Sequence, residues 1–98
     1  MQTKSKSAPQ VRILYSENDS AALSSQAPMF ENAGYAVQKA IGRKSTEETL
    51  KREKFDIVIL GHTLTRDDRH HLPYMAKKAD EGTLVLVLHA SCRTKLQR

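Results

Sequence analysis

The residues of this chain best suited to metal chemistry are its four histidines. His62 and His89 each follow an apolar run, as Glu17 does near the N-terminus. Imidazole and carboxylate groups bind Zn²⁺ when three or four of them converge at about 2.0–2.2 Å. His70 and His71 are adjacent, so on a helix they diverge by about 100° and do not form a ligand pair. The spacing matches no metal signature and favours surface histidines. A metal or small-ligand site made by Glu17, His62 and His89 is the alternative.

Nucleophilic chemistry has weaker support than metal binding. A hydrolase needs a nucleophile, a base and a group that orients the base. His89 beside Ser91 or Cys92 offers the first two, but no nucleophile elbow and no third residue accompany them. Asp67 and Asp68 stand at the expected start of a helix, where carboxylates cap amides and favour the dipole. We therefore expect no enzyme activity, no catalytic residue, no bound metal and no cofactor.

An alternation of strands and helices positions these residues. Residues 55–60 and 84–88 are continuous apolar, β-branched runs, typical of strands that are buried on both faces of a parallel sheet. Residues 11–15 and 35–41 form two further strand-like runs. The helices expected between the strands run from an N-cap at Asp19 or Ser20 to Ala33 before Gly34, from a capping box at Ser45 and Glu48 to Lys54, and from Arg66 to Asp80.

Three local features qualify these helices. Pro28 predicts a kink or a late start in the first helix, because proline removes a backbone donor and clashes with the previous turn. Pro73 must lie in the first turns of the third helix or bend it. The second helix carries two i, i+4 pairs in the favourable order, Glu47 with Lys51 and Glu48 with Arg52.

The rhythm of strand and helix predicts an α/β fold, with an open parallel sheet of about four strands flanked by three helices. In such sheets, chemistry lies at the carboxyl ends of the strands. The relevant loops are residues 16–19, 61–68 and 89–92.

The composition favours a single small domain in a reducing compartment. The chain has 98 residues, of which 39% are apolar and 28% charged. Its one cysteine, Cys92, has no internal disulfide partner. The N-terminus has no apolar signal-peptide region, and no stretch reaches the ~20 apolar residues of a membrane span. We expect a cytoplasmic protein with no membrane association.

The net charge of +5 lies mainly at the two ends of the chain. Residues 1–10 are predicted to be a disordered basic leader and residues 92–98 a basic C-terminal tail around the folded residues 11–91. Residues 13–92 carry ten basic and eleven acidic side chains. This distribution argues against nucleic-acid binding, which needs a basic stripe on a folded face.

Four segments resemble the receiver domain of two-component response regulators. They are Ile13–Asp19, an apolar run into acids; Ala33–Val37, with Ala-Gly-Tyr-x-Val; Phe55–Leu60, with Phe-Asp and four apolar residues; and Leu86–Ala90. The resemblance covers residues 11–91 and implies a flavodoxin-like sheet with strand order 2-1-3-4.

The departures from this family fall at its functional positions. Gly61 stands where the phosphate-accepting aspartate is expected, so no side chain is present to accept a phosphoryl group. Glu17 and Asn18 replace the acidic pair that holds Mg²⁺ in the family, one charge short for a hard cation. His89 replaces the hydroxyl residue that senses the phosphate. The chain stops at Arg98, before the family's last strand and helix.

A receiver framework with an altered site implies a degenerate, truncated receiver that does not take part in phosphorelay chemistry. We expect a signal-transduction module that binds a protein partner or forms a homodimer. The last strand, within residues 83–89, would form an open sheet edge that invites pairing with another chain.

Overall fold

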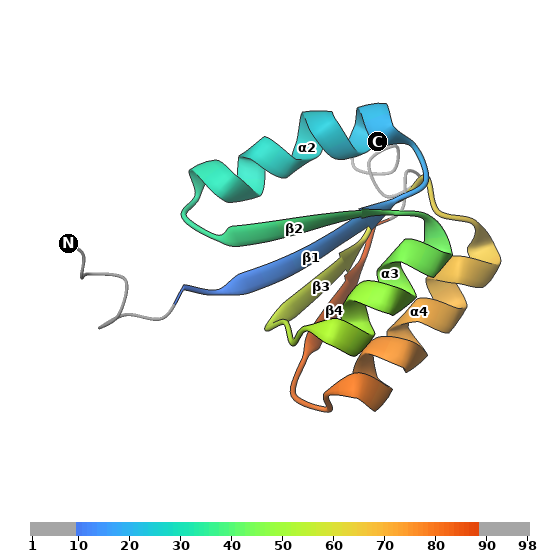
Figure 1. Ribbon diagram of the computed structural model, residues 1–98. Coiled ribbons are helices and arrows are strands. Elements are labelled where there is room, and N and C mark those ends of the chain that lie inside the picture. The colour runs from blue at the N-terminus through green and yellow to red at the C-terminus, as the bar shows by residue number, and fades with distance from the viewer. Residues whose placement is uncertain (1–9, 89–98) are drawn as a thin grey trace, which may run out of the picture.

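The computed structural model describes residues 10–88 of the chain (Figure 1). Within these residues, four strands form one parallel sheet in the order β2-β1-β3-β4. Helix α2 covers one face, and α3 and α4 lie side by side on the other. The predicted α/β fold and strand order are confirmed. The elements are β1 (Arg12–Glu17), α2 (Ser20–Asn32), β2 (Ala36–Ile41), α3 (Gly42–Arg52), β3 (Ile57–Leu60), α4 (Arg66–Ala79) and β4 (Leu84–Val87).

Each face of the sheet has its own apolar core, because successive strand residues point to opposite faces. On the α2 side the buried core is Ile13, Tyr15, Leu23, Ala27 and Ile59. On the side of α3 and α4 it is Leu14, Ala40, Leu50, Phe55, Val58, Leu60, Leu64, Leu72 and Ala76. The central strands β1 and β3 contribute to both cores, which fixes the relative position of their carboxyl ends.

The second helix begins four residues earlier than its capping-box pattern predicts. Helix α3 starts at Gly42, and no side chain caps it, so the predicted cap at Ser45 is wrong. Gly42 has a φ of 84°, which lets β2 turn directly into the helix. Thr46 is then buried, where its hydroxyl lies 2.6 Å from that of Ser16. This contact between helix and sheet outweighs the local cap.

The two ion pairs predicted along α3 are also absent from the ion pairs of residues 10–88. Glu47 instead contacts Arg43 at 3.3 Å and His71 of α4 at 2.8 Å. Burial raises the pKa of Glu47, but the hydrogen bonds and charges of Arg43 and His71 outweigh it and lower the pKa below 4.5. Lys51 and Arg52 therefore keep no carboxylate partner within the described part of the chain.

The first helix begins as predicted. Asp19 is its N-cap and accepts a hydrogen bond from the Ala21 amide at 3.1 Å. Gly34, with a φ of 101°, follows the helix end. Pro28 lies inside α2, which excludes the late start, and the kink, the other predicted outcome, stays a prediction. Pro73 lies at the eighth position of α4, past its first two turns. None of the helices between residues 10 and 88 combines the length and apolarity that a membrane crossing needs.

Candidate functional site

The candidate site lies at the carboxyl edge of the sheet, where β1 and β3 end side by side. Strand β1 ends at Glu17, and Gly61 directly follows β3. The register pairs Ser16 with Leu60, and the Gly61 amide donates to the Ser16 carbonyl at 2.8 Å. Glu17 and Gly61, each one residue further along, are therefore neighbours across the sheet. This is the edge at which open parallel sheets hold their ligands.

The Glu17 carboxylate is fully buried and is held by three donors. Its Oε1 accepts hydrogen bonds from the Thr63 amide at 3.0 Å and from the Thr63 hydroxyl at 2.6 Å. Its Oε2 accepts a hydrogen bond from the Tyr15 hydroxyl. Burying a carboxylate is costly unless such donors replace the lost water. The fold itself therefore solvates this carboxylate and engages both of its oxygens.

Tyr15 serves this site as a hydrogen-bond donor. Burial raises the pKa of its hydroxyl above the ordinary 10.0, and the hydrogen bond to Glu17 and the charge of that carboxylate raise it further. Ionisation would place two negative oxygens in contact inside a poorly polarisable interior. The Tyr15 ring packs edge-on against Phe30 of α2, with the centroids 5.4 Å apart. Its hydroxyl is consequently neutral and fixed in direction.

Gly61 is required by the position of Glu17. A Cβ added at Gly61 would lie 1.8 Å from the Glu17 Cδ and 2.0 Å from each carboxylate oxygen. Ordinary contacts of a Cβ begin at 3.4 Å. The backbone at Gly61 does not have a positive φ, so the constraint is steric. The carboxylate of Glu17 thus fills the space in which any side chain at position 61 would begin.

Thr63 ties the two loops of this edge together. Its hydroxyl donates to Glu17 and accepts hydrogen bonds from the Asn18 amide at 2.8 Å and the Asp19 amide at 3.1 Å. One side chain from the loop after β3 therefore holds both the carboxylate and the start of α2. No sequence pattern pointed to Thr63. The only signal was a hydroxyl residue in the loop after the third strand, which is too common a feature to single it out.

The structure places the other candidate residues apart from this cluster. Asn18 is exposed and joins the cluster through its backbone amide. His62 is half-buried, and its carbonyl accepts a hydrogen bond from the Arg69 guanidinium at 3.2 Å. His89 lies outside the described residues, as do Ser91, Cys92 and the two predicted tails. Among residues 10–88, no three histidine, cysteine or acidic side chains are grouped so that they could hold a metal ion.

The start of α4, which carries Asp67 and Asp68, is capped by Thr65 and not by either aspartate. Thr65 is the N-cap of α4, and its hydroxyl accepts a hydrogen bond from the Asp68 amide at 3.1 Å. Asp67 and Asp68 lie in the first turn, where their charges favour the helix dipole as predicted. The Asp68 carboxylate also lies 3.6 Å from the Arg43 guanidinium, which links α4 to α3.

Comparison with known protein families, curated proteins and solved structures finds no match to this chain. The chain is therefore defined by its own features: an open parallel α/β sheet with a buried carboxylate over a glycine at its carboxyl edge. The resemblance to receiver domains stays a prediction from the sequence.

Proposed function

We propose that this chain is a degenerate receiver-like module of signal transduction, which takes no phosphoryl group and acts by binding protein. The observation that carries the proposal is the Glu17 carboxylate, which lies where a side chain at position 61 would begin. In this proposal the acceptor position has lost its side chain, and a neighbouring acid fills the vacated space. The site is then a structural element that joins β1, β3 and the loop at Thr63.

The electrostatics of the cluster support the absence of phosphotransfer. An incoming phosphoryl group carries negative charge, and Glu17 already places a buried negative charge at the same point. Mg²⁺ requires near-ideal octahedral oxygen geometry. Both Glu17 oxygens are engaged by Tyr15 and Thr63, and the adjacent Asn18 side chain is neutral. The same engagement weighs against the alternative metal or ligand site of Glu17, His62 and His89.

The protein-binding part of the proposal is supported by strand β4. Leu84 and Leu86 of β4 and Leu88, directly after it, form a stripe that is 53%, 43% and 40% exposed on the α2 side of the sheet. The Leu84 amide donates to the carbonyl of Asp56, directly before β3, and the Leu88 amide donates to that of Leu60, so the backbone groups of Val85 and Val87 point to the outer edge. Within residues 10–88 no strand pairs with that edge.

A second copy of this chain is the occupant that we propose for the β4 edge. A twofold axis beside β4 would pair the two edge strands and bring the same leucine stripe of each copy together. Single apolar residues on a surface are ordinary, but a contiguous stripe beside an open edge favours association. The proposal also places the protein in the cytoplasm, as the single cysteine of the sequence favours.

The experiment that tests the proposed function is intact-mass measurement after incubation with acetyl phosphate and Mg²⁺. A phosphorylatable receiver treated in parallel shows that the reagent is active. We expect no added phosphoryl mass on this chain. A labile adduct on Asp67, Asp68 or a histidine would show that another residue accepts the group, and the proposal would then fail.

A further inference from the structure

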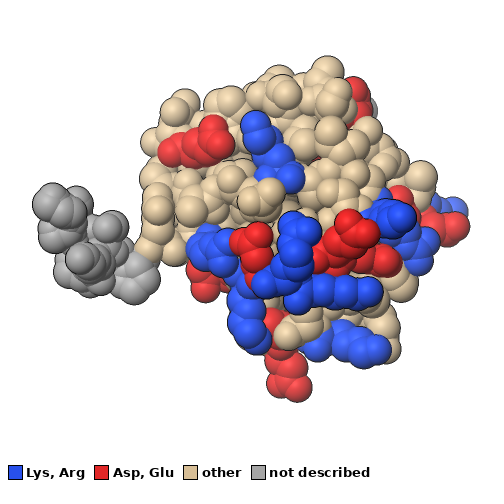
Figure 2. Space-filling view, in the orientation of Figure 1, with Lys and Arg blue, Asp and Glu red and all other residues tan. Residues whose placement is uncertain are grey.

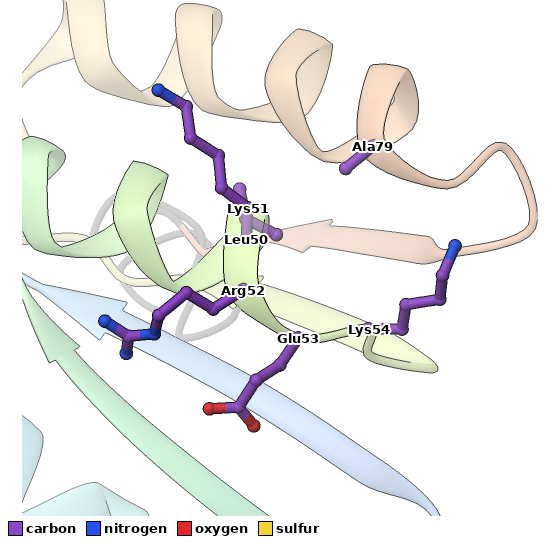
Figure 3. A pocket seen from close by; sticks show the side chains of 6 residues that line it. All are labelled: Leu50, Lys51, Arg52, Glu53, Lys54 and Ala79. Carbon is purple, nitrogen blue, oxygen red and sulfur yellow. The ribbon is translucent and has the colours of Figure 1, made fainter.

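A groove lies at the end of the molecule opposite the Glu17 cluster, between the C-terminal ends of α3 and α4. It consists of two adjoining hollows of about 310 Å³ and 230 Å³. The two hollows share Leu50, Lys51 and Ala79, so they adjoin. Figure 3 shows the side chains that line the larger one. The other residues that line it are Arg52, Glu53, Lys54, Met75 and Lys78.

The rim of the groove is basic. Among residues 10–88, Glu53 is the one acid that lines it, and this acid pairs with Arg12 of β1. Lys51 and Lys54 extend on the α4 side of the groove, whereas Glu53 extends the other way (Figure 3). Lys78 lines the second hollow from α4. Basic side chains gather over the face formed by α3 and α4, with acidic ones among them (Figure 2).

The rim lysines form no ion pairs within the described part of the chain. Among residues 10–88, Lys51, Lys54 and Lys78 have no carboxylate within 4.0 Å. The Lys78 ammonium lies over the Tyr74 ring of the same helix, 5.9 Å from its centroid. Lysines in the last turn of a helix favour its dipole, which accounts for basic residues at these helix ends. That effect does not account for Lys54, which lies beyond α3, or for the hollow between the helices.

The floor of the groove is apolar. Leu50 forms its base and is only 7% exposed, and Met75 packs partly against the same core. Ala79 is exposed at the side and leaves the hollow open. An apolar floor with a cationic rim is complementary to a segment that carries both a large apolar side chain and carboxylates.

We propose that this groove binds an acidic amphipathic segment of a partner protein. One apolar side chain of the segment enters the hollow between Leu50, Met75 and Ala79, and its carboxylates pair with Lys51, Lys54 and Lys78. The inference rests on the proposed function for the statement that the partner is a protein. The chain cannot supply the segment from residues 1–9 or 89–98, whose charged side chains are all basic.

The groove fits this occupant better than two other anionic surfaces. No aromatic side chain lines it, so nucleic-acid bases would find nothing to stack on. Its apolar atoms lie at the bottom of a depression, whereas a lipid surface is engaged by apolar side chains that protrude. A segment with an inserted side chain uses both the depth and the rim.

The test is a fluorescence-anisotropy titration of the full chain with a labelled peptide, acetyl-Glu-Asp-Leu-Phe-Glu-Asp-Leu-Glu-amide. We expect saturable binding that weakens as salt is added. Lys51→Glu and Lys54→Glu should each weaken it about fivefold, because each reverses a rim charge. Ala79→Leu should weaken it about tenfold by filling the hollow without a change of charge.

Matched variants away from the groove serve as controls. Lys39→Glu makes the same charge change at an exposed position of β2, and Ala21→Leu makes the same size change at an exposed position of α2. Both variants should bind the peptide as the unaltered chain does. Circular dichroism checks that every variant is folded. Lack of binding, or binding that is indifferent to Lys51→Glu and Ala79→Leu, would overturn the inference.

Two further probes test whether the groove binds a membrane or a nucleic acid in place of an acidic peptide. Phosphatidylserine vesicles and a single-stranded oligonucleotide are titrated against the same variants. Binding to either probe that is tighter than peptide binding, and is lost on Lys51→Glu, would overturn the inference in favour of a membrane or a nucleic acid. A phosphoryl adduct in the mass experiment would instead overturn the proposed function and leave the peptide titration unaltered, so the two failures are distinguishable.

Discussion

Gly61→Ala is expected to destabilise the protein severely, although it adds only one methyl group. The new Cβ would lie 1.8–2.0 Å from three atoms of the Glu17 carboxylate, against an ordinary contact of 3.4 Å or more. The carboxylate must therefore move by roughly 1.5 Å, which breaks its hydrogen bonds to Tyr15 and Thr63. Overpacking costs about 1–3 kcal/mol, and a lost hydrogen bond to a charged group about 1.5–3 kcal/mol.

We expect these effects to reduce the free energy of unfolding by about 4 kcal/mol, a large share of the ~5–15 kcal/mol of a typical domain. Urea denaturation followed by circular dichroism measures this loss. Gly82→Ala is the matched control, because a Cβ there would meet only the Asp80 Oδ1 at 3.5 Å. Its effect should stay within about 1 kcal/mol.

A double-mutant cycle then assigns the cost to Glu17. Glu17→Ala alone removes a buried charge but leaves Tyr15 and Thr63 without their acceptor, so it should also destabilise the fold. Combined with Gly61→Ala it removes the clash, and the double variant should be at least about 2 kcal/mol more stable than the sum of the single effects predicts. Additive effects, or a Gly61→Ala variant as stable as Gly82→Ala, would refute the steric account.

Three further outcomes follow from the same structure. Thr63→Val should lower the free energy of unfolding by about 2–3 kcal/mol and Thr63→Ser by much less, as measured in urea, because serine keeps the hydroxyl that donates to Glu17 and accepts from the amides just before α2; equal losses would contradict this. Because folding raises the pKa of Tyr15, the contribution of Tyr15 to the free energy of unfolding is fully present below pH 10.0 and is lost above it, where the tyrosine of the unfolded chain ionises first. Tyr15→Phe should remove that part of the alkaline loss in denaturation curves, and an unchanged dependence of the free energy of unfolding on pH would count against it. Leu86→Glu should abolish self-association in sedimentation equilibrium, whereas Tyr74→Glu, on a more exposed large side chain of α4, should not; a wild-type chain that is monomeric at high micromolar concentration would disprove the β4 dimer.

The sheet could be predicted from the sequence because its signals are local and strong. The runs at residues 57–60 and 84–87 are apolar at every position, as is typical of strands in a parallel sheet. Strand β3 is largely buried as expected, but the expectation that residues 84–88 are buried on both faces is wrong, because Leu84 and Leu86 are exposed on the α2 side of the edge strand. The start of α3 could not be predicted in the same way. The Ser45 capping pattern is local, but Thr46 forms its hydrogen bond with Ser16, thirty residues away, and this tertiary contact decides the register.

Two residues of the site could be predicted from the sequence, but their arrangement could not. Glu17 and Gly61 follow apolar runs, so the sequence places both at the carboxyl edge of the sheet. That the Glu17 carboxylate fills the space above Gly61 depends on the pairing of Ser16 with Leu60, which no local pattern contains. The groove between α3 and α4 could not be predicted either, because it also depends on a contact between elements distant in the sequence. The sequence pairs Lys51 with Glu47, but in the structure Glu47 contacts His71 of α4 and leaves Lys51 at the rim of the groove.

The most direct test of the filled acceptor site is a set of amide NMR spectra recorded with and without beryllofluoride, a phosphoryl analogue, in the presence of Mg²⁺. The Thr63 amide donates to the Glu17 carboxylate, the Asn18 amide donates to the Thr63 hydroxyl, and Gly61 lies against the carboxylate, so these three amides would report any anion or cation that enters. We expect their signals to remain where they are in the untreated protein. Saturable shifts of these three amides would show that the pocket accepts a phosphoryl analogue despite Glu17, and would contradict the account.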